Sequence, residues 1–220
     1  MRVIILILAL ALTGCSDQSQ HGNGHITENT RPLPPFEQVS VSGNFNIKIA
    51  CGGKQLVTVK TDDNLHTYID MHVKHGILFV EPRETLKPSS DNQLAISAPN
   101  IRGVHLDGEH LFTIENVQNN KLVVTLTGHN HGQIRGTTKR LTARLDGKNH
   151  IHAGQLSIEK ADLHLVGNNH FTGTIHKSYS SVLSGNNTVL YYGKARANKH
   201  LINGVGMVRH LNRGEIDTTT

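Results

Sequence analysis

A glycine recurs across the second half of the chain, each time inside a similar short phrase such as LTGHNHG, LDGKNHI or LVGNNHF. The spacings are 20, 19, 20, 18 and 19 residues, and the members are Gly108, Gly128, Gly147, Gly167, Gly185 and Gly204. A fixed period of this length is typical of stacked, quasi-one-dimensional architectures, in which one supersecondary unit is copied along an axis. The period therefore constrains the fold far more than it constrains the activity.

The residues around each glycine alternate between apolar and polar. The position two residues before it is always apolar: Leu106, Leu126, Leu145, Leu165, Leu183 and Ile202. The position four residues after it is mainly apolar: Phe112, Gly132, Ile151, Phe171, Val189 and Val208. Apolar residues at even distances and polar residues at odd distances make a period of two, which is typical of strands with one buried face. Because no stretch of the mature chain shows a helical period, the sequence predicts an all-β protein.

The position two residues after the glycine carries a recurring polar side chain. Its members are His110, Asn130, Asn149, Asn169 and Asn187, and Gly206 ends the series. In a stack of strands, equivalent residues lie about 4.8 Å apart, and asparagine amides at that spacing can donate and accept in a continuous ladder. The repeat glycine then suits a corner that needs positive φ or close approach. Together these columns predict a β-solenoid with coils of about 19 residues over residues 101–211.

Residues 36–100 are related to the repeats but less regular. Residues 39–49, VSVSGNFNIKI, alternate cleanly, and we expect further strands at 56–60, 68–73 and 77–80. Residues 81–93 are expected to form an exposed loop, and residues 94–99 lead into the repeats. Because a solenoid needs atypical ends to prevent edge-to-edge growth, we expect residues 36–100 to cap one end and the polar tail, residues 212–220, to blunt the other.

A leucine-rich repeat is the competing architecture. The pattern Leu-x-x-x-Leu-x-x-x-Asn occurs from Leu122 to Asn130 and from Leu141 to Asn149. Both stretches lack the usual Leu-x-Leu spacing of that architecture, and the period lies at or below its lower limit of about 20 residues. The β-solenoid is therefore the preferred interpretation.

Residues 1–14 have the features of a lipoprotein signal peptide. Arg2 precedes an apolar run of about ten residues, half the length needed to cross a bilayer. The following LTGC, residues 12–15, resembles the lipobox that a lipoprotein signal peptidase cuts. The resemblance implies that Cys15 becomes the first mature residue and carries acyl chains on its sulfur and amine, which anchor it to the membrane. The serine that follows indicates the outer membrane, and a plain secretory signal with an incidental cysteine is the alternative.

Residues 16–35 are rich in Ser, Gln, Gly, Asn and His and end in RPLPP, which predicts a flexible tether with a stiffer final part between the lipidated Cys15 and the head. Cys51 is the only other cysteine, so it is expected to be a small buried hydrophobe rather than half of a disulfide. The net charge is +5, the Lys and Arg residues are scattered, and only 4% of residues are aromatic. This composition argues against a nucleic-acid partner.

The order of these segments resembles the GIN-domain family, which is described as an auto-transporter adhesin head. The motifs that carry the resemblance are VSGNF, LVTV, GILFVEP, ISAP, the repeated Leu-x-Gly-x-Asn and VLYYG, over roughly residues 36–195. The resemblance implies a right-handed parallel β-helix-like fold on a secreted or lipid-anchored bacterial protein. The family often has Ser-Gly-Ser-Gly in its repeat, whereas this chain usually has Asn in place of the second glycine. The family supplies no catalytic residues.

Sixteen histidines are the most unusual part of the composition. His131, His150 and His170 stand three residues after a repeat glycine on consecutive predicted coils, with His129 and His152 on the same polar face. Stacking would bring the three imidazoles within steps of about 5 Å, close enough for two of them to share Zn²⁺, Ni²⁺ or Cu²⁺. A flat row makes a poor tetrahedral cage, so a polar column without a metal or cofactor is the main interpretation. A surface that becomes charged below about pH 6.5 is a further one.

Asp107 and Asp146 both precede a repeat glycine, two coils apart, which predicts a separation of about 9–10 Å. That is near the upper end of the range for the carboxylate pair of an inverting glycosidase. Thr127 stands between them in the same column, no sugar-stacking aromatic lies nearby, and aspartate before glycine is ordinary turn chemistry. The chain also has no Walker loop, GxSxG, HExxH or calcium-binding nonapeptide. The sequence therefore predicts no enzyme.

The expected protein is a lipid-anchored component of the bacterial envelope, at the outer membrane, with a non-catalytic β-solenoid head. We expect that head to act as an adhesin or surface-binding module for a glycan or a surface protein. A structural or assembly role facing the periplasm is the main alternative. An enzyme that acts on polysaccharide through its aspartates comes third.

Overall fold

The computed structural model describes residues 19–212. The expected signal peptide (residues 1–14), the lipidation site Cys15 and residues 213–220 of the expected polar tail lie outside the described residues. In chain order the elements are β1 (Ser19–His21), β2 (Ile26–Thr30), β3 (Gln38–Cys51), β4 (Leu56–Asp62), the 3₁₀ helix η1 (Asp63–Tyr68), β5 (Ile69–Lys74), β6 (Ile77–Pro82), β7 (Thr85–Lys87), β8 (Gln93–Ala98), β9 (Gly103–Tyr192) and β10 (Arg196–His210). The predicted all-β class is confirmed. Within residues 19–212, no helix is long and apolar enough to span a bilayer.

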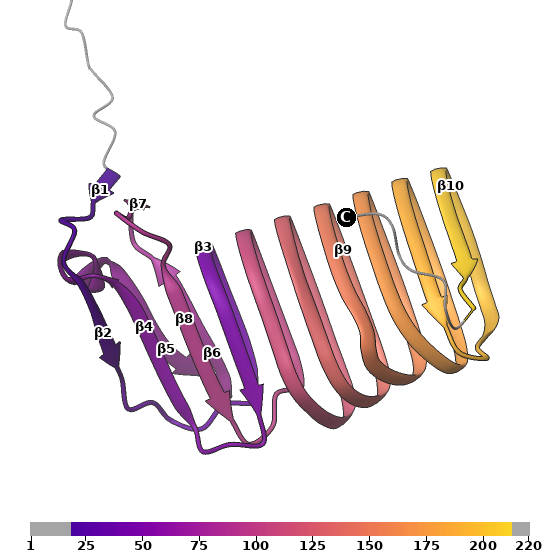
Figure 1. Ribbon diagram of the computed structural model, residues 1–220, viewed down its shortest axis with the longest axis horizontal. Helices are drawn as coiled ribbons and strands as arrows, with labels where there is room; N and C mark the ends of the chain where they lie inside the picture. The colour runs from indigo at the N-terminus through magenta and orange to yellow at the C-terminus, as the bar shows by residue number, and fades with distance from the viewer. Residues whose placement is uncertain (1–18, 213–220) are drawn as a thin grey trace, which may run out of the picture.

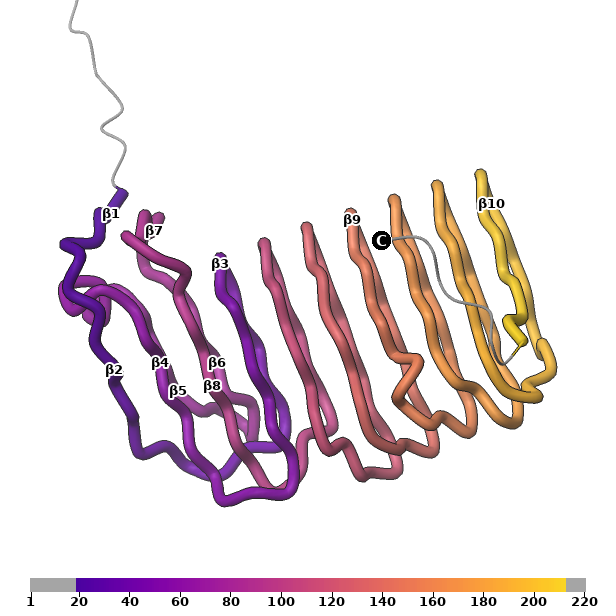
Figure 2. Tube along the Cα trace, viewed as in Figure 1, coloured from indigo at the N-terminus to yellow at the C-terminus, as the bar shows by residue number. Residues whose placement is uncertain are grey.

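β9 is a run of 90 residues in strand conformation that bends repeatedly. Figure 1 shows its successive segments side by side between β3 and β10, and the Cα trace in Figure 2 shows that each segment follows a similar path. β3 pairs in parallel with the first segment and places Gly43 opposite Gly108. β10 pairs in parallel with the last and places Gly204 opposite Gly185. The glycines are therefore in register at both ends of β9.

The repeat glycines form a column in which only glycine fits. All six have positive φ, from +94° at Gly128 to +131° at Gly108. A Cβ atom on Gly147 would collide with the carbonyl oxygen of Gly128, and one on Gly167 would collide with that of Gly147. The absence of a side chain thus allows both the corner and the close approach of neighbouring segments.

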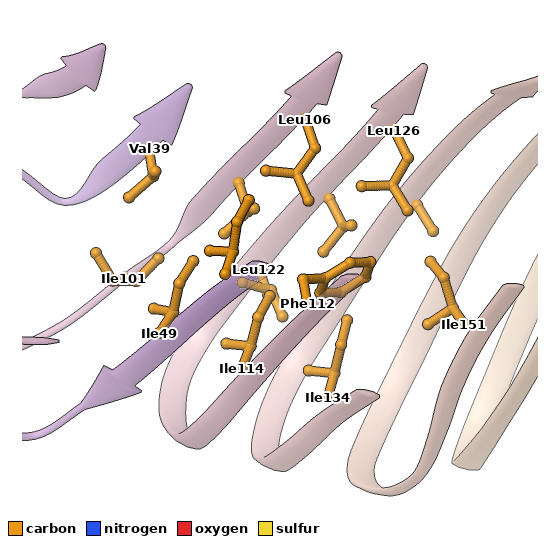
Figure 3. Packing of buried hydrophobic residues seen from close by; sticks show 14 of the residues in the cluster. Val39, Ile49, Ile101, Leu106, Phe112, Ile114, Leu122, Leu126, Ile134 and Ile151 are labelled. Carbon is orange, nitrogen blue, oxygen red and sulfur yellow. The ribbon is translucent and has the colours of Figure 1, made fainter. Parts of the chain in front are cut away.

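The apolar columns fill the interior between the segments. In Figure 3, Leu106 and Leu126 point inward from successive segments, as do Ile114 and Ile134. These four side chains are at most 1% exposed, and each contributes about 1.5–3 kcal/mol through burial. Gly132 interrupts the column next to Phe112, because a Cβ atom there would collide with the buried phenyl ring.

The N-terminal part departs from a purely parallel arrangement. β8 and β6 run parallel to β3, but β4 is antiparallel to both β8 and β2, and β5 is antiparallel to β6. The sheets are therefore mixed, whereas the family resemblance implied parallel pairing. The β5–β6 connection shows the reason: His75 (φ +51°) and Gly76 (φ +73°) make a two-residue turn that reverses the chain. Parallel pairing would need a much longer crossover at this point.

The structure also differs from the flexible tether expected over residues 16–35. In the described part of this stretch, β1 pairs with β7 and β2 pairs with β4. The buried carboxylate of Asp62 holds the segment in place. It accepts the Gly24 N–H at 2.7 Å, the Ser89 N–H at 2.9 Å and the Ser89 hydroxyl at 2.7 Å. Because these partners are distant in sequence, the polar composition of residues 16–35 did not reveal them.

Candidate binding groove

The four asparagines of the repeat, here called the asparagine ladder, are buried and joined through their side chains. Asn130 Nδ2 donates to Asn149 Oδ1 at 2.8 Å. Asn149 Nδ2 donates to Asn169 Oδ1 at 2.8 Å, and Asn169 Nδ2 donates to Asn187 Oδ1 at 2.9 Å. The exposed fractions are only 1–3%. A buried amide without partners would destabilise the fold, so these bonds hold neighbouring segments in register.

Each ladder amide also makes a local hydrogen bond. The Nδ2 atom donates to the carbonyl oxygen three residues earlier at 2.7–2.9 Å, and the acceptors are Thr127, Asp146, Val166 and Ser184. The local bond spans the repeat glycine and fixes the direction of the amide. Hydrogen bonds therefore hold the ladder both within a segment and between segments, and the ladder forms a rigid floor beneath the outward-facing side chains.

His110 occupies the ladder position on the first segment of β9. It is 2% exposed, its ring is stacked on Phe45 with a centroid distance of 6.3 Å, and its Nε2 atom lies 3.3 Å from the Asp107 carbonyl oxygen. Burial lowers the pKa of His110 below its ordinary value. Among the described residues, neither His110 Nδ1 nor Asn130 Oδ1 has a hydrogen-bond partner. The continuous pattern of donors therefore breaks between these two side chains.

An open hollow of about 480 Å³, here called the histidine groove, lies over the start of the ladder. Its lining includes residues directly after the repeat glycine and residues three places after it. The first set is Glu109, His129, Lys148 and Asn168, and the second is Leu111, His131, His150 and His170. The walls thus carry one carboxylate, one amine and several imidazoles and amides, which can donate or accept hydrogen bonds.

The structure brings the three histidines of the predicted column together. The His131 and His150 ring centroids are 5.0 Å apart, and those of His150 and His170 are 4.5 Å apart. His152 joins them, at 4.3 Å from His150. His131 and His170 meet His150 edge to face, at interplanar angles of 71° and 66°. Within residues 19–212, no group of three or more His, Cys, Asp or Glu side chains is arranged to hold a metal ion.

The two candidate aspartates do not line the histidine groove. Asp107 and Asp146 are exposed, and their backbone carbonyl oxygens accept the bonds from His110 and Asn149 that span the glycine corner. The structure thus gives them a place in the turn. Glu109, Leu111 and Lys148 were not predicted as site residues, although their odd distance from the repeat glycine indicates that they face outward.

Comparison with known proteins places this architecture. The family described as "Putative auto-transporter adhesin, head GIN domain" matches residues 35–195. Among curated proteins, none matches the chain.

Several solved structures are similar. A "putative adhesin" from Bacteroides fragilis aligns with a TM-score of 0.71 at 17% identity and covers 87% of this chain and 100% of its own. A "putative lipid binding protein" from Parabacteroides distasonis has a TM-score of 0.58 at 14% identity, with 89% and 100% covered. A "putative adhesin" from the same species has a TM-score of 0.56 at 15% identity, with 88% and 100% covered. At such identities these likenesses show a shared fold alone. Because the family match spans residues 35–195, however, this chain belongs to the GIN-domain family.

Proposed function

We propose that this protein is a lipid-anchored binding module of the bacterial envelope, with a non-catalytic head that takes its ligand in the histidine groove. We further propose that residues 101–211 form a right-handed parallel β-solenoid with coils of about 19 residues, which the less regular residues 36–100 cap at one end. The anchor rests on the LTGC motif, in which Cys15 would carry the lipid. The likeness to proteins named as adhesins or as a lipid-binding protein supports binding rather than catalysis.

The observation that carries the proposal is the combination of a braced floor and repeating polar walls. The hydrogen bonds of the asparagine ladder fix the floor before any ligand arrives, so little conformational entropy is lost on binding. The walls present histidine, lysine and asparagine side chains on successive segments. Such a surface suits an extended polar ligand, and a glycan is the ligand class we favour.

Binding is tested with the whole mature protein on an array of neutral and acidic glycans and immobilised matrix proteins. We expect His150→Gln to weaken binding, because His150 lies at the centre of the imidazole cluster. His176→Gln is the matched control, since His176 is an exposed histidine of β9 outside the histidine groove. Equal binding by the wild type and His150→Gln would remove the groove from the proposal.

Location and anchoring are tested in cells. Cys15→Ser should abolish labelling with radioactive palmitate and release the protein from the membrane fraction. Digestion of the head by protease added to intact cells would support a surface-binding role at the outer membrane. Protection until lysis would favour the alternative, a structural or assembly lipoprotein that faces the periplasm. A polysaccharide-cleaving activity that Asp107→Asn or Asp146→Asn abolishes would overturn the non-catalytic assignment.

A further inference from the structure

The C-terminal end of the described chain combines positive charge with exposed apolar side chains. Residues 163–212 contain no Asp or Glu, although the whole chain has 17. Their basic residues are Lys177, Lys194, Arg196, Lys199 and Arg209. Three of the five lie in β10, and all three of these are exposed. Leu201, Ile202, Val205 and Met207 of the same strand are 41–75% exposed.

β10 is also an edge strand. It is the last strand in its sheet, and it pairs with β9 along one side only (Figure 1). Among residues 19–212, no strand pairs with its other side. A free edge of this length presents a row of backbone N–H and C=O groups that can accept a further strand. Natural edge strands are commonly shortened, twisted or covered, whereas β10 runs for 15 residues.

The side chains of β10 break the pattern of the preceding segments in a way that indicates a covered position. Val205 pairs with Asn186, in a column that is polar on every earlier segment, yet Val205 is apolar and 75% exposed. Ile202 pairs with Leu183, in the buried leucine column, yet its exposed fraction is 41% against 1% for Leu183. Apolar surface is therefore left open on both faces of this one strand.

We propose that the free edge of β10 is a docking site for an extended acidic segment of a partner protein, which adds as the next strand. Backbone hydrogen bonds along β10 would hold the segment, and its alternate side chains would cover Ile202 on one face and Val205 on the other. Its carboxylates would meet Lys199 and Arg209. This site is separate from the histidine groove, so the proposal goes beyond the binding function proposed above.

Two other occupants fit the structure less well. A second copy docked through its own β10 would bring like charges together, because β10 has no carboxylate to face Lys199 or Arg209. Insertion into an anionic membrane would satisfy the charge and the apolar side chains, but hydrocarbon would leave the free backbone N–H and C=O groups without partners. An added strand would pair its carboxylates with the basic side chains, cover the apolar side chains and form hydrogen bonds with the free backbone groups of β10.

The probe is a synthetic peptide as long as β10, labelled for fluorescence anisotropy with the whole protein, with valines at the positions that pair with Ile202 and Val205 and glutamates at those that pair with Lys199 and Arg209. The same peptide with lysine in place of each glutamate is its control. We expect only the glutamate peptide to bind, with weaker affinity at higher salt. Bound peptide should slow hydrogen exchange of the β10 amides by about tenfold or more, while exchange in β4 stays unchanged.

The decisive variant is Lys199→Glu/Arg209→Glu, which should lower the affinity for the glutamate peptide by about tenfold or more and create affinity for the lysine peptide. The charge-matched control is Lys139→Glu/Arg144→Glu, two exposed residues of β9, which should change neither. Three results would overturn the proposal. They are equal loss in both double variants, binding to phosphatidylglycerol vesicles without binding to the peptide, and peptide binding only after removal of residues 213–220.

Discussion

Replacing His110 by asparagine tests the account of the asparagine ladder. Within residues 19–212 of the wild type, His110 Nδ1 and Asn130 Oδ1 are buried without hydrogen-bond partners, while the amides further along donate to the next Oδ1 at 2.8–2.9 Å. An asparagine at position 110 would place an Nδ2–H group beside Asn130 Oδ1, which stabilises by about 1 kcal/mol. It would also remove the stack on Phe45, which contributes about 0.5–1.5 kcal/mol. At neutral pH these effects nearly offset.

The pH dependence gives the sharper test. Because burial lowers the pKa of His110, the unfolded chain binds a proton at a higher pH than the folded protein does. The contribution of His110 to stability is therefore fully present above its unfolded value of about 6.5 and is lost as the pH falls through the folded value. Within that window the wild type loses up to about 1.4 kcal/mol per pH unit from this residue. His110→Asn removes the loss, so the variant should become the more stable protein on acidification.

The assay is urea unfolding followed by far-UV circular dichroism at several values from pH 7.5 to pH 5, since the chain has no tryptophan to report by fluorescence. The control is His129→Asn, an exposed histidine beside the ladder, which should keep the wild-type pH slope. Parallel stability curves for the wild type and His110→Asn across this range would refute the reasoning, because they would mean that His110 gains its proton equally easily in both states.

Three further predictions concern the fold. Gly147→Ala should lower the free energy of unfolding by about 3 kcal/mol or more, because Gly147 has a φ of +102° and a Cβ atom there would collide with the carbonyl oxygen of Gly128. Its control is Gly24→Ala, which should lower it by about 1 kcal/mol, because Gly24 has a φ of +85° but room for a Cβ atom. Urea unfolding measures both. Burial raises the pKa of Asp62, but the bonds from Ser89 and Gly24 outweigh it and hold the pKa below the ordinary value. Its stabilisation should therefore be present above about pH 3.9 and fade as the pH falls through the folded value. Asp62→Asn should lower the free energy of unfolding by about 1.5–3 kcal/mol at pH 7 and should lose less stability than the wild type on acidification. Urea unfolding at pH 7 and at a pH below about 3.9 measures the difference. Burial also raises the pKa of the Cys51 thiol, so this 7%-exposed group should react with a disulfide reagent only as urea unfolds the chain; rapid reaction in the native state would contradict its placement.

The periodic part of this protein could be predicted from its sequence. The distance from each repeat glycine determines whether a side chain faces the interior or the solvent, so Leu126 could be assigned to the core and Asn149 to a stacked column. The two-residue period of a strand determines which face a side chain occupies, and the repeat period places equivalent residues of successive segments beside one another. The histidine cluster around His150 follows from the same regularity.

The tertiary structure alone decided the features that are not periodic. The carboxylate of Asp62 accepts hydrogen bonds from Gly24 and Ser89, which joins segments that are far apart in the chain. No local sequence pattern predicts these bonds. The stack of the His110 ring on Phe45 likewise joins two strands that are far apart in the sequence. The free edge of β10 exists because no later segment covers it within the described chain. Repetition determines what a residue faces, whereas the ends of a stack depend on contacts that occur only once.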